Sequence, residues 1–262
     1  MYTYSYEHIL FLKKKKKEKR KIICIQILIL AIFLITWELL SKYNIINPFL
    51  FSSPTKIFTT LNHLIKNDLF YHIWVTLYET IISFSIAFIG GIIIASILWW
   101  NKILAKVCDP YLTVINSLPK VALGPLIIIW VGASANSIIF MALMISFIIS
   151  IINIYNGFIS TDQNYITLFK SMKASKLQIF FHIILPCNKE TIISSLKINI
   201  SMSLIGVIMG ELLVSKAGLG YLIMYGSQVF NITLVLSSVF VLGILSFIMY
   251  YIIHFIEKKL MK

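Results

Sequence analysis

Six stretches of about 20 predominantly apolar residues run through this 262-residue chain, and they constrain its fold more than any other feature. A hydrocarbon core about 30 Å thick requires about 20 residues of α-helix to cross it, because a helix rises about 1.5 Å per residue. We therefore predict an all-α, polytopic membrane protein with six transmembrane helices. The expected spans are residues 22–40, 73–100, 107–131, 138–155, 191–214 and 232–255.

The basic residues give the expected orientation in the membrane. Short loops on the cytosolic side of a membrane protein carry an excess of lysine and arginine. With a cytosolic N-terminus, 17 of the 23 basic residues lie on that side. We expect both termini in the cytosol, with a basic tail at residues 1–21 and a single transmembrane domain at 22–262. The first apolar run exceeds a signal-peptide core and lacks a small-residue cleavage site, so we expect an uncleaved span.

Composition narrows the function classes. A net charge of +13 can indicate nucleic-acid binding, but here 59% of residues are hydrophobic and the basic residues flank the apolar runs. Zinc-finger spacing and a soluble domain are both missing from the sequence, so we expect no nucleic-acid partner. The three cysteines are widely spaced and the five histidines lack ligand spacing. We therefore expect reduced thiols and no metal site.

Two prolines interrupt the third expected span. Pro119 and Pro125 lie six residues apart with Lys120 between them. A proline frees a backbone carbonyl, and such a break persists in a membrane only where protein or a water-filled cavity satisfies the backbone. Two interpretations stay open: a kink buried in the bundle, or a helix that lines a transport pathway. Under the second, Pro119, Lys120 and Pro125 are pathway or gate candidates.

The fifth expected span contains small residues and an acid. Gly206 and Gly210 form a G-x-x-x-G pattern that lets another helix approach closely, so we assign them to helix packing. Glu211 follows directly, and an ionisable group at membrane depth marks either a pathway or a buried structural pair. Glu211 is therefore a further pathway or gate candidate. The same two interpretations apply to Glu38 and Glu79.

The longest expected cytosolic segment between spans, residues 157–190, has two apolar stripes at helical spacing. The first stripe is Tyr165, Leu168, Phe169 and Met172, and the second is Leu177, Phe180, Phe181 and Ile184. We predict two short amphipathic helices joined near Lys173 and Ala174. Such a pair can rest on anionic lipid headgroups or dock into a groove of a soluble partner.

At this segment the chain resembles the permeases of binding-protein-dependent ABC importers. The sequence KSMKASKLQIFFHIILP at 170–186 is similar to their EAA loop, whose pattern is roughly E-A-A-x-x-x-G-A-S-x-x-x-x-F-x-x-V-x-L-P. Residues 49–58, 117–132 and 210–223 resemble further signatures of the sulfonate, taurine and nitrate branch, in the family's order. The resemblance covers about residues 48–257. It implies the type I ABC importer permease fold.

The resemblance also implies roles for individual residues. The segment 157–190 would be the cytosolic coupling loop that docks on the ATPase. The expected contacts with the ATPase are Tyr165, Leu168, Phe169, Lys170, Met172, Lys173, Ala174 and Ser175. Gly218 and Gly220 are the glycines of an acidic-to-Gly-Leu-Gly loop.

The chain departs from the family pattern at two places in this loop. Thr167, Leu168 and Phe169 stand where the family has Glu-Ala-Ala, and Lys173 stands where it has glycine. Glycine suits a left-handed turn, and a lysine there costs about 1 kcal/mol. We expect either a strained turn or a turn of different shape.

The expected function is that of a permease subunit, not an enzyme. The chain has no G-x-x-x-x-G-K-[ST] sequence, so ATP and Mg would be bound by a partner and we expect no cofactor here. The resemblance implies a permease homodimer in a bacterial cell membrane, surrounded by lipid. It also implies a cytosolic ATPase dimer and an extracellular or lipid-anchored binding protein. The solute would be small, such as a sulfonate, taurine, nitrate or a pyrimidine precursor.

Two other classes of function stay open from the sequence. A secondary transporter or channel could use six spans with broken helices, although the structured loop would then lack a purpose. A membrane-embedded enzyme would need a nucleophile and base, a carboxylate pair or a metal cluster, and the spacing of the polar residues suggests none.

Overall fold

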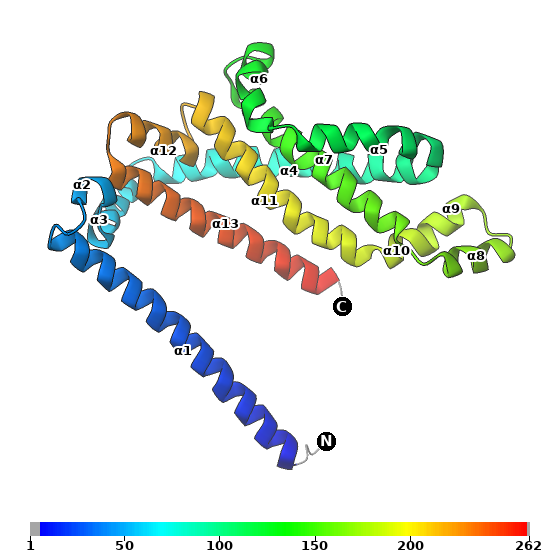
Figure 1. Ribbon diagram of the computed structural model, residues 1–262, viewed down its shortest axis with the longest axis horizontal. Coiled ribbons are helices and arrows are strands. Elements are labelled where there is room, and N and C mark those ends of the chain that lie inside the picture. The colour runs from blue at the N-terminus through cyan, green and yellow to red at the C-terminus, as the bar shows by residue number, and fades with distance from the viewer. Residues whose placement is uncertain (1–5, 261–262) are drawn as a thin grey trace. The chain divides into compact units, whose positions relative to one another are not determined.

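The computed structural model describes residues 6–260, with side chains described for 11–259, and every regular element among them is helical (Figure 1). The chain divides into two compact units, residues 1–63 and 64–262. The described helices include five that are long and apolar enough to cross a membrane, and a bent pair that could supply a sixth. The all-helical architecture that we predict is confirmed.

The first unit is built around one long helix. Its elements are α1 (Tyr6–Lys42), α2 (Pro48–Phe51) and the start of α3 (Pro54–Lys66). The described part of the expected basic tail is the first half of α1, so it continues into the apolar run without a break. Glu38 accepts hydrogen bonds from Thr55, at 2.8 Å from Oγ1 and 3.1 Å from the amide. A carboxylate at the start of α3 satisfies one of its free amides, so Glu38 has a structural partner.

The core of the second unit is a packed group of long apolar helices. They are α4 (Leu69–Trp100), α7 (Ala135–Ile159), α11 (Lys189–Val214) and α13 (Ile232–Leu260), with α12 (Leu219–Gln228) joining the last two. Helix α7 packs against both α4 and α11, and α13 packs against α11 and α12 (Figure 1).

Gly206 and Gly210 lie where α11 crosses α7. A Cβ at Gly206 would collide with the backbone of Ala142, and one at Gly210 would lie 2.9 Å from Cα of Ile138. The two helices can approach this closely because both positions lack a side chain. The G-x-x-x-G pattern therefore positions the end of α11 that carries Glu211.

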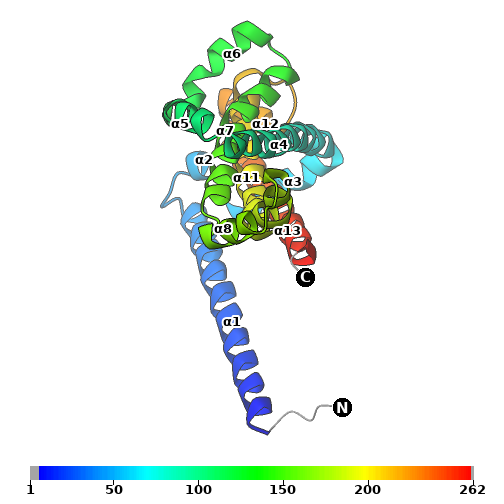
Figure 2. The ribbon, with the colours of Figure 1, turned by 90° about the vertical axis from the view of Figure 1, so that its right-hand side faces the viewer.

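The third expected span is two helices rather than one. It consists of α5 (Lys102–Ser117), a 3₁₀ turn η1 (Lys120–Leu123) and α6 (Gly124–Val131), and the two parts meet at 82°. Figures 1 and 2 both show α6 turned away from the axis of α5. Pro119 precedes η1 and Pro125 lies in the first turn of α6, where a missing N–H costs no helical hydrogen bond. The irregularity expected over 107–131 is thus a sharp bend, because the prolines end one helix and begin the next.

The segment between α7 and α11 contains short helices. They are α8 (Gln163–Ser171), α9 (Lys176–Ile179), a π-helical turn η2 (Phe180–Ile184) and α10 (Leu185–Cys187). The predicted pair of short helices joined near Lys173 is confirmed, although the second helix continues through η2 into α10. Pro186 follows the wide turn, which ends in a hydrogen bond from the amide of Leu185 to the carbonyl of Phe180.

Candidate functional site

The base of the segment between α7 and α11 is closed by one side chain. Asn188, directly before α11, donates hydrogen bonds to Oγ1 of Thr161 at 2.7 Å and to the carbonyl of Ile184 at 2.8 Å. Asn188 and Thr161 are both buried. Because this amide satisfies groups at both ends of the segment, residues 161–188 have a fixed base. They lie within the segment 157–190 that is expected to be the coupling loop, and we keep that name for it.

The turn between α8 and α9 is a Schellman motif. The amide of Ala174 donates to the carbonyl of Phe169 at 3.0 Å, and the amide of Lys173 donates to that of Lys170 at 2.9 Å. Lys173 has a φ of +60°, in the left-handed region that the motif requires. The turn thus keeps the shape expected for a glycine, and the lysine carries a backbone strain of about 1–2 kcal/mol.

The start of α9 is fixed by a capping box. The amide of Gln178 donates to Oγ of Ser175 at 3.3 Å, and the amide of Ser175 donates to Oε1 of Gln178 at 2.7 Å. Lys176 then donates to the backbone carbonyl of Trp100 at the end of α4, and its ammonium lies 5.2 Å from the centroid of that indole ring. The loop is therefore held to the end of α4 by a charged contact.

Phe180 packs the coupling loop against the long helices. It is 7% exposed, and its ring lies 5.1 Å from Trp99 of α4 and 5.8 Å from Phe158 of α7, measured between centroids. Ala95, Ile154 and Ile184 complete a buried cluster around it. A displacement of the loop must move the ends of α4 and α7, because close-packed side chains transmit strain.

The other face of the coupling loop is exposed. Tyr165, Leu168 and Met172 of the first apolar stripe are more than half exposed, whereas Phe169 packs on the buried cluster. In the second stripe, Leu177 and Phe181 are exposed and Phe180 and Ile184 are buried. The stripes therefore divide into a face that packs on the protein and a face that no described residue covers.

A second feature of the structure is the environment of Glu211 near the end of α11. Oε1 accepts a hydrogen bond of 2.6 Å from the hydroxyl of Thr76 on α4, and Oε2 accepts one of 2.6 Å from the amide of Gly220 on α12. The hydroxyl oxygen of Thr76 also accepts a hydrogen bond of 2.8 Å from the amide of Leu219. Glu211, 1% exposed, joins three helices through these bonds. We call residues 218–220 with Glu211 the acid-turn.

Gly218 is required by the acid-turn for two reasons. Its φ of +106° is a conformation that residues with a Cβ rarely adopt. A Cβ there would also overlap the carboxyl group of Glu211. The amide of Gly218 donates to Nδ1 of His72 on α4 at 3.0 Å, which adds another bond between the turn and that helix. Gly218 and Gly220, expected as loop residues, thus lie directly on the acid.

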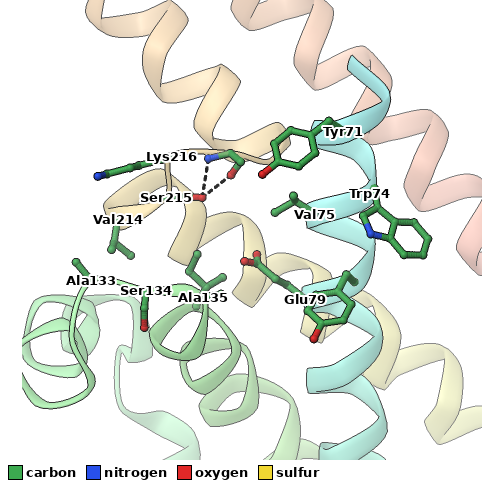
Figure 3. A pocket seen from close by; sticks show the side chains of 13 residues that line it. Tyr71, Trp74, Val75, Glu79, Ala133, Ser134, Ala135, Val214, Ser215 and Lys216 are labelled. Carbon is green, nitrogen blue, oxygen red and sulfur yellow. Dashed lines mark hydrogen bonds between the residues drawn. The ribbon is translucent and has the colours of Figure 1, made fainter. Parts of the chain in front are cut away.

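A cavity of about 660 Å³ opens beside the acid-turn (Figure 3). Its walls come from the first turns of α4, the start of α7 and the chain directly after α11. The lining residues are Tyr71, Trp74, Val75, Tyr78, Glu79, Ala133, Ser134, Ala135, Ile138, Val214, Ser215, Lys216 and Ala217. Ser215 and Ala217 bond to each other in a tight turn, so the chain after α11 has a defined shape.

Glu79 lies at the floor of this cavity. It is 2% exposed, and its carboxyl group is an electrostatic neighbour of that of Glu211. Among the described residues, none donates a hydrogen bond to its Oε2. A buried acceptor left without a hydrogen bond costs about 1–3 kcal/mol.

The three candidates of the broken span lie elsewhere. Pro119, Lys120 and Pro125 do not line the cavity. The ammonium of Lys120 donates to the carbonyl of Asn116 at 2.8 Å and to its Oδ1 at 3.1 Å, so it caps the end of α5. The structure thus brings Glu211 together with Gly218 and Gly220 and leaves Lys120 separate.

His72 and Thr76 were not predicted as site residues, and for Glu79 the sequence left open a pathway role or a buried structural pair. A signal was present, because His72, Thr76 and Glu79 stand at i, i+4 and i+7 in a predominantly apolar helix. Polar residues at helical spacing share one face, and that face meets Glu211. The partner segment at 218–220 lies far along the chain, so the pairing itself could be seen only in the structure.

A family model described as "Binding-protein-dependent transport system inner membrane component" matches residues 87–262, which is more than half of the chain. The chain belongs to this family. It is a multi-pass inner membrane protein and the permease subunit of an ABC importer, without enzymatic activity of its own. An importer of this kind also contains an ATPase and a substrate-binding protein. The family and the function that the sequence predicts are confirmed.

Individual relatives cover nearly the whole permease. The formylaminopyrimidine transport permease protein ThiX of Halalkalibacterium halodurans is 28% identical over 228 residues, which is 87% of this chain and 91% of the relative. The nitrate import permease protein NrtB of Synechocystis is 24% identical over 239 residues, which is 87% of this chain and 86% of the relative.

A solved structure shows the fold. A chain of the methionine ABC transporter MetNI, in an inward-facing conformation, matches with a TM-score of 0.63 at 18% identity, covering 73% of this chain and 95% of that chain. The expected type I ABC importer permease fold is confirmed.

Proposed function

We propose that the permease imports a small solute, with the coupling loop as its docking element for the ATPase. Support comes from the exposed apolar face of Tyr165, Leu168 and Met172, on a loop that is fixed at its base and at both helix ends. Such a face, at i, i+3 and i+7, suits a groove in a soluble partner. Lys170, Lys173, Ala174 and Ser175 shape the turn beside it.

The proposed mechanism transmits motion through Phe180. ATP-driven closure of the ATPase pair displaces α8, and the buried cluster carries that displacement to the ends of α4 and α7. ATP must favour one conformation of the permease by about 5.5 kcal/mol to shift a population from 1:99 to 99:1. ATP and Mg are bound by the partner, and this chain takes no cofactor.

The proposed assembly is a permease homodimer in a bacterial membrane, with lipid around it and both termini in the cytosol. The excess of basic residues on that side supports this orientation. It places the coupling loop in the cytosol beside the ATPase dimer. The start of α4 and the cavity beside Glu79 then lie towards an extracellular or lipid-anchored binding protein. The solute is small, as formylaminopyrimidine and nitrate are, and a sulfonate or taurine belongs to the same size class.

Co-purification tests this proposal. The full-length tagged permease is extracted from membranes that also contain its ATPase, and the bound ATPase is quantified. We expect a stoichiometric ATPase with the wild type and loss of most of it with Leu168→Asp, because a charge would be buried in the groove. Gln163→Asp adds the same charge to the exposed first turn of α8 and should retain the ATPase. Equal retention by both variants would contradict the docking role.

A further inference from the structure

We propose that the cavity beside Glu79 is a solute site that selects small aromatic molecules with N–H donors and rejects anions. This inference rests on the proposed import function and specifies the solute class. The volume of about 660 Å³ lies within the usual range for small-molecule sites, about 300–1,000 Å³.

The position of the cavity suits a solute that crosses the membrane. Glu79 follows the start of α4 by ten residues, which corresponds to about 15 Å of helix. That distance is about half of the hydrocarbon thickness. An ionisable group at that depth marks a route for a solute, and Oε2 of Glu79 has no hydrogen-bond partner among the described residues.

The acidic floor determines which polar groups the site can accept. Both oxygens of Glu211 are already occupied by Thr76 and Gly220, whereas Oε2 of Glu79 accepts no hydrogen bond from any described residue. A ligand N–H would satisfy this atom. A sulfonate, carboxylate or nitrate would offer only acceptors to this acceptor atom, and it would lie beside the hydrogen-bonded pair of carboxyl groups of Glu79 and Glu211.

The walls favour an aromatic ring. Tyr71, Trp74 and Tyr78 of α4 are among the residues that line the cavity, and stacked or edge-to-face contacts with such rings stabilise a flat aromatic solute. An electron-poor or protonated heterocycle gains further from the ring faces.

The one lysine that lines the cavity among the described residues is Lys216, and its ammonium group does not reach the carboxyl group of Glu79. Figure 3 shows its side chain directed away from Glu79, on the far side of Ser215. An anion that reached the floor would therefore lack a positive partner there.

Equilibrium dialysis of the purified permease–ATPase complex tests the site. The probes are radiolabelled 4-amino-2-methylpyrimidine, ethanesulfonate and nitrate. We expect saturable binding of the aminopyrimidine alone, and at least tenfold weaker binding to Glu79→Ala. Glu190→Gln, which changes an exposed acid at the start of α11, should bind as the wild type does. Saturable binding of either anion with none of the aminopyrimidine would overturn the proposal, as would unchanged affinity in Glu79→Ala.

A surface substitution keeps the test decisive if Glu79→Ala does not fold. Trp74 is 63% exposed, so Trp74→Ala should assemble normally and weaken aminopyrimidine binding several-fold. Unchanged binding by an assembled Trp74→Ala would count against the site. Retention of the ATPase in each sample separates these outcomes from a failure of the import function, because loss of solute selectivity leaves the complex intact.

Discussion

The amide of Gly220 donates a hydrogen bond of 2.6 Å to Oε2 of Glu211, and this bond joins the start of α12 to the end of α11. The other oxygen of the same carboxyl group reaches Thr76 on α4. One buried acid therefore fixes the relative positions of three helices that surround the cavity. The Gly-Leu-Gly sequence is explained by this geometry, since its backbone wraps the carboxyl group.

Gly218→Ala should destabilise the permease by about 1–3 kcal/mol, because the new Cβ meets the carboxyl group of Glu211 at a positive φ. Thermal unfolding of the purified protein in detergent measures this change. Gly243→Ala is the matched control, since nothing lies within 4 Å of a Cβ there and the residue is helical. That variant should be neutral or more stable by about 0.5–1 kcal/mol. Equal loss in both would argue against the acid-turn.

Thr76→Val should also lower the free energy of unfolding, by about 1–3 kcal/mol. The hydroxyl both donates to Glu211 and accepts from Leu219, so its removal leaves two buried groups unsatisfied. Thr113→Val is the control, because that hydroxyl is exposed and bonds only within α5, and we expect a change within about 0.5 kcal/mol. Denaturation midpoints that coincide for the two variants would refute the role of Thr76.

Lys173→Gly should stabilise the coupling loop, by about 1 kcal/mol, since it removes the cost of a left-handed lysine. Lys170→Gly, three residues earlier and within α8, should destabilise the coupling loop by a similar amount, because glycine is unfavourable inside a helix. Protection of the loop amides from hydrogen exchange reports both changes. A loss of protection in Lys173→Gly would show that the lysine side chain makes a contact worth more than the strain.

Phe180→Ala should lower the free energy of unfolding by about 3–5 kcal/mol, because it removes the ring that packs against both Trp99 and Phe158. Without that ring we also expect ATP hydrolysis to be uncoupled from solute uptake. Phe181 is its neighbour and is 57% exposed, so Phe181→Ala should leave stability nearly unchanged. Uptake into proteoliposomes, divided by ATP hydrolysed, measures the coupling. Similar ratios for the two variants would rule out transmission through the buried cluster.

The sequence was sufficient for the long helices and for the coupling loop. Apolar runs of membrane length have one stable solution, so the expected spans at 22–40, 73–100, 138–155, 191–214 and 232–255 each lie within one helix. The position of the turn was also predictable, because a glycine position in the family pattern identified Lys173, although the sequence left open a strained turn or a turn of different shape.

The remaining features depend on contacts between distant segments. The 82° bend before α6 was not predictable, because two prolines allow either a kink or a complete break. The two apolar stripes of the coupling loop predicted two amphipathic helices without showing what covers their apolar faces. In the structure each stripe is partly buried against the long helices and partly exposed. The pairing of Thr76 with Glu211 joins residues 135 positions apart.

Site-specific photo-crosslinking from position 168 tests directly whether the exposed face of α8 docks on the ATPase. A photoreactive phenylalanine replaces Leu168 of α8 in one variant and Phe240 of α13 in another, both exposed apolar positions. We expect a crosslink to the ATPase from position 168 and none from position 240. Crosslinks from position 168 to lipid alone, without the ATPase, would show that the exposed face of α8 rests on the membrane and would contradict its role as the docking element.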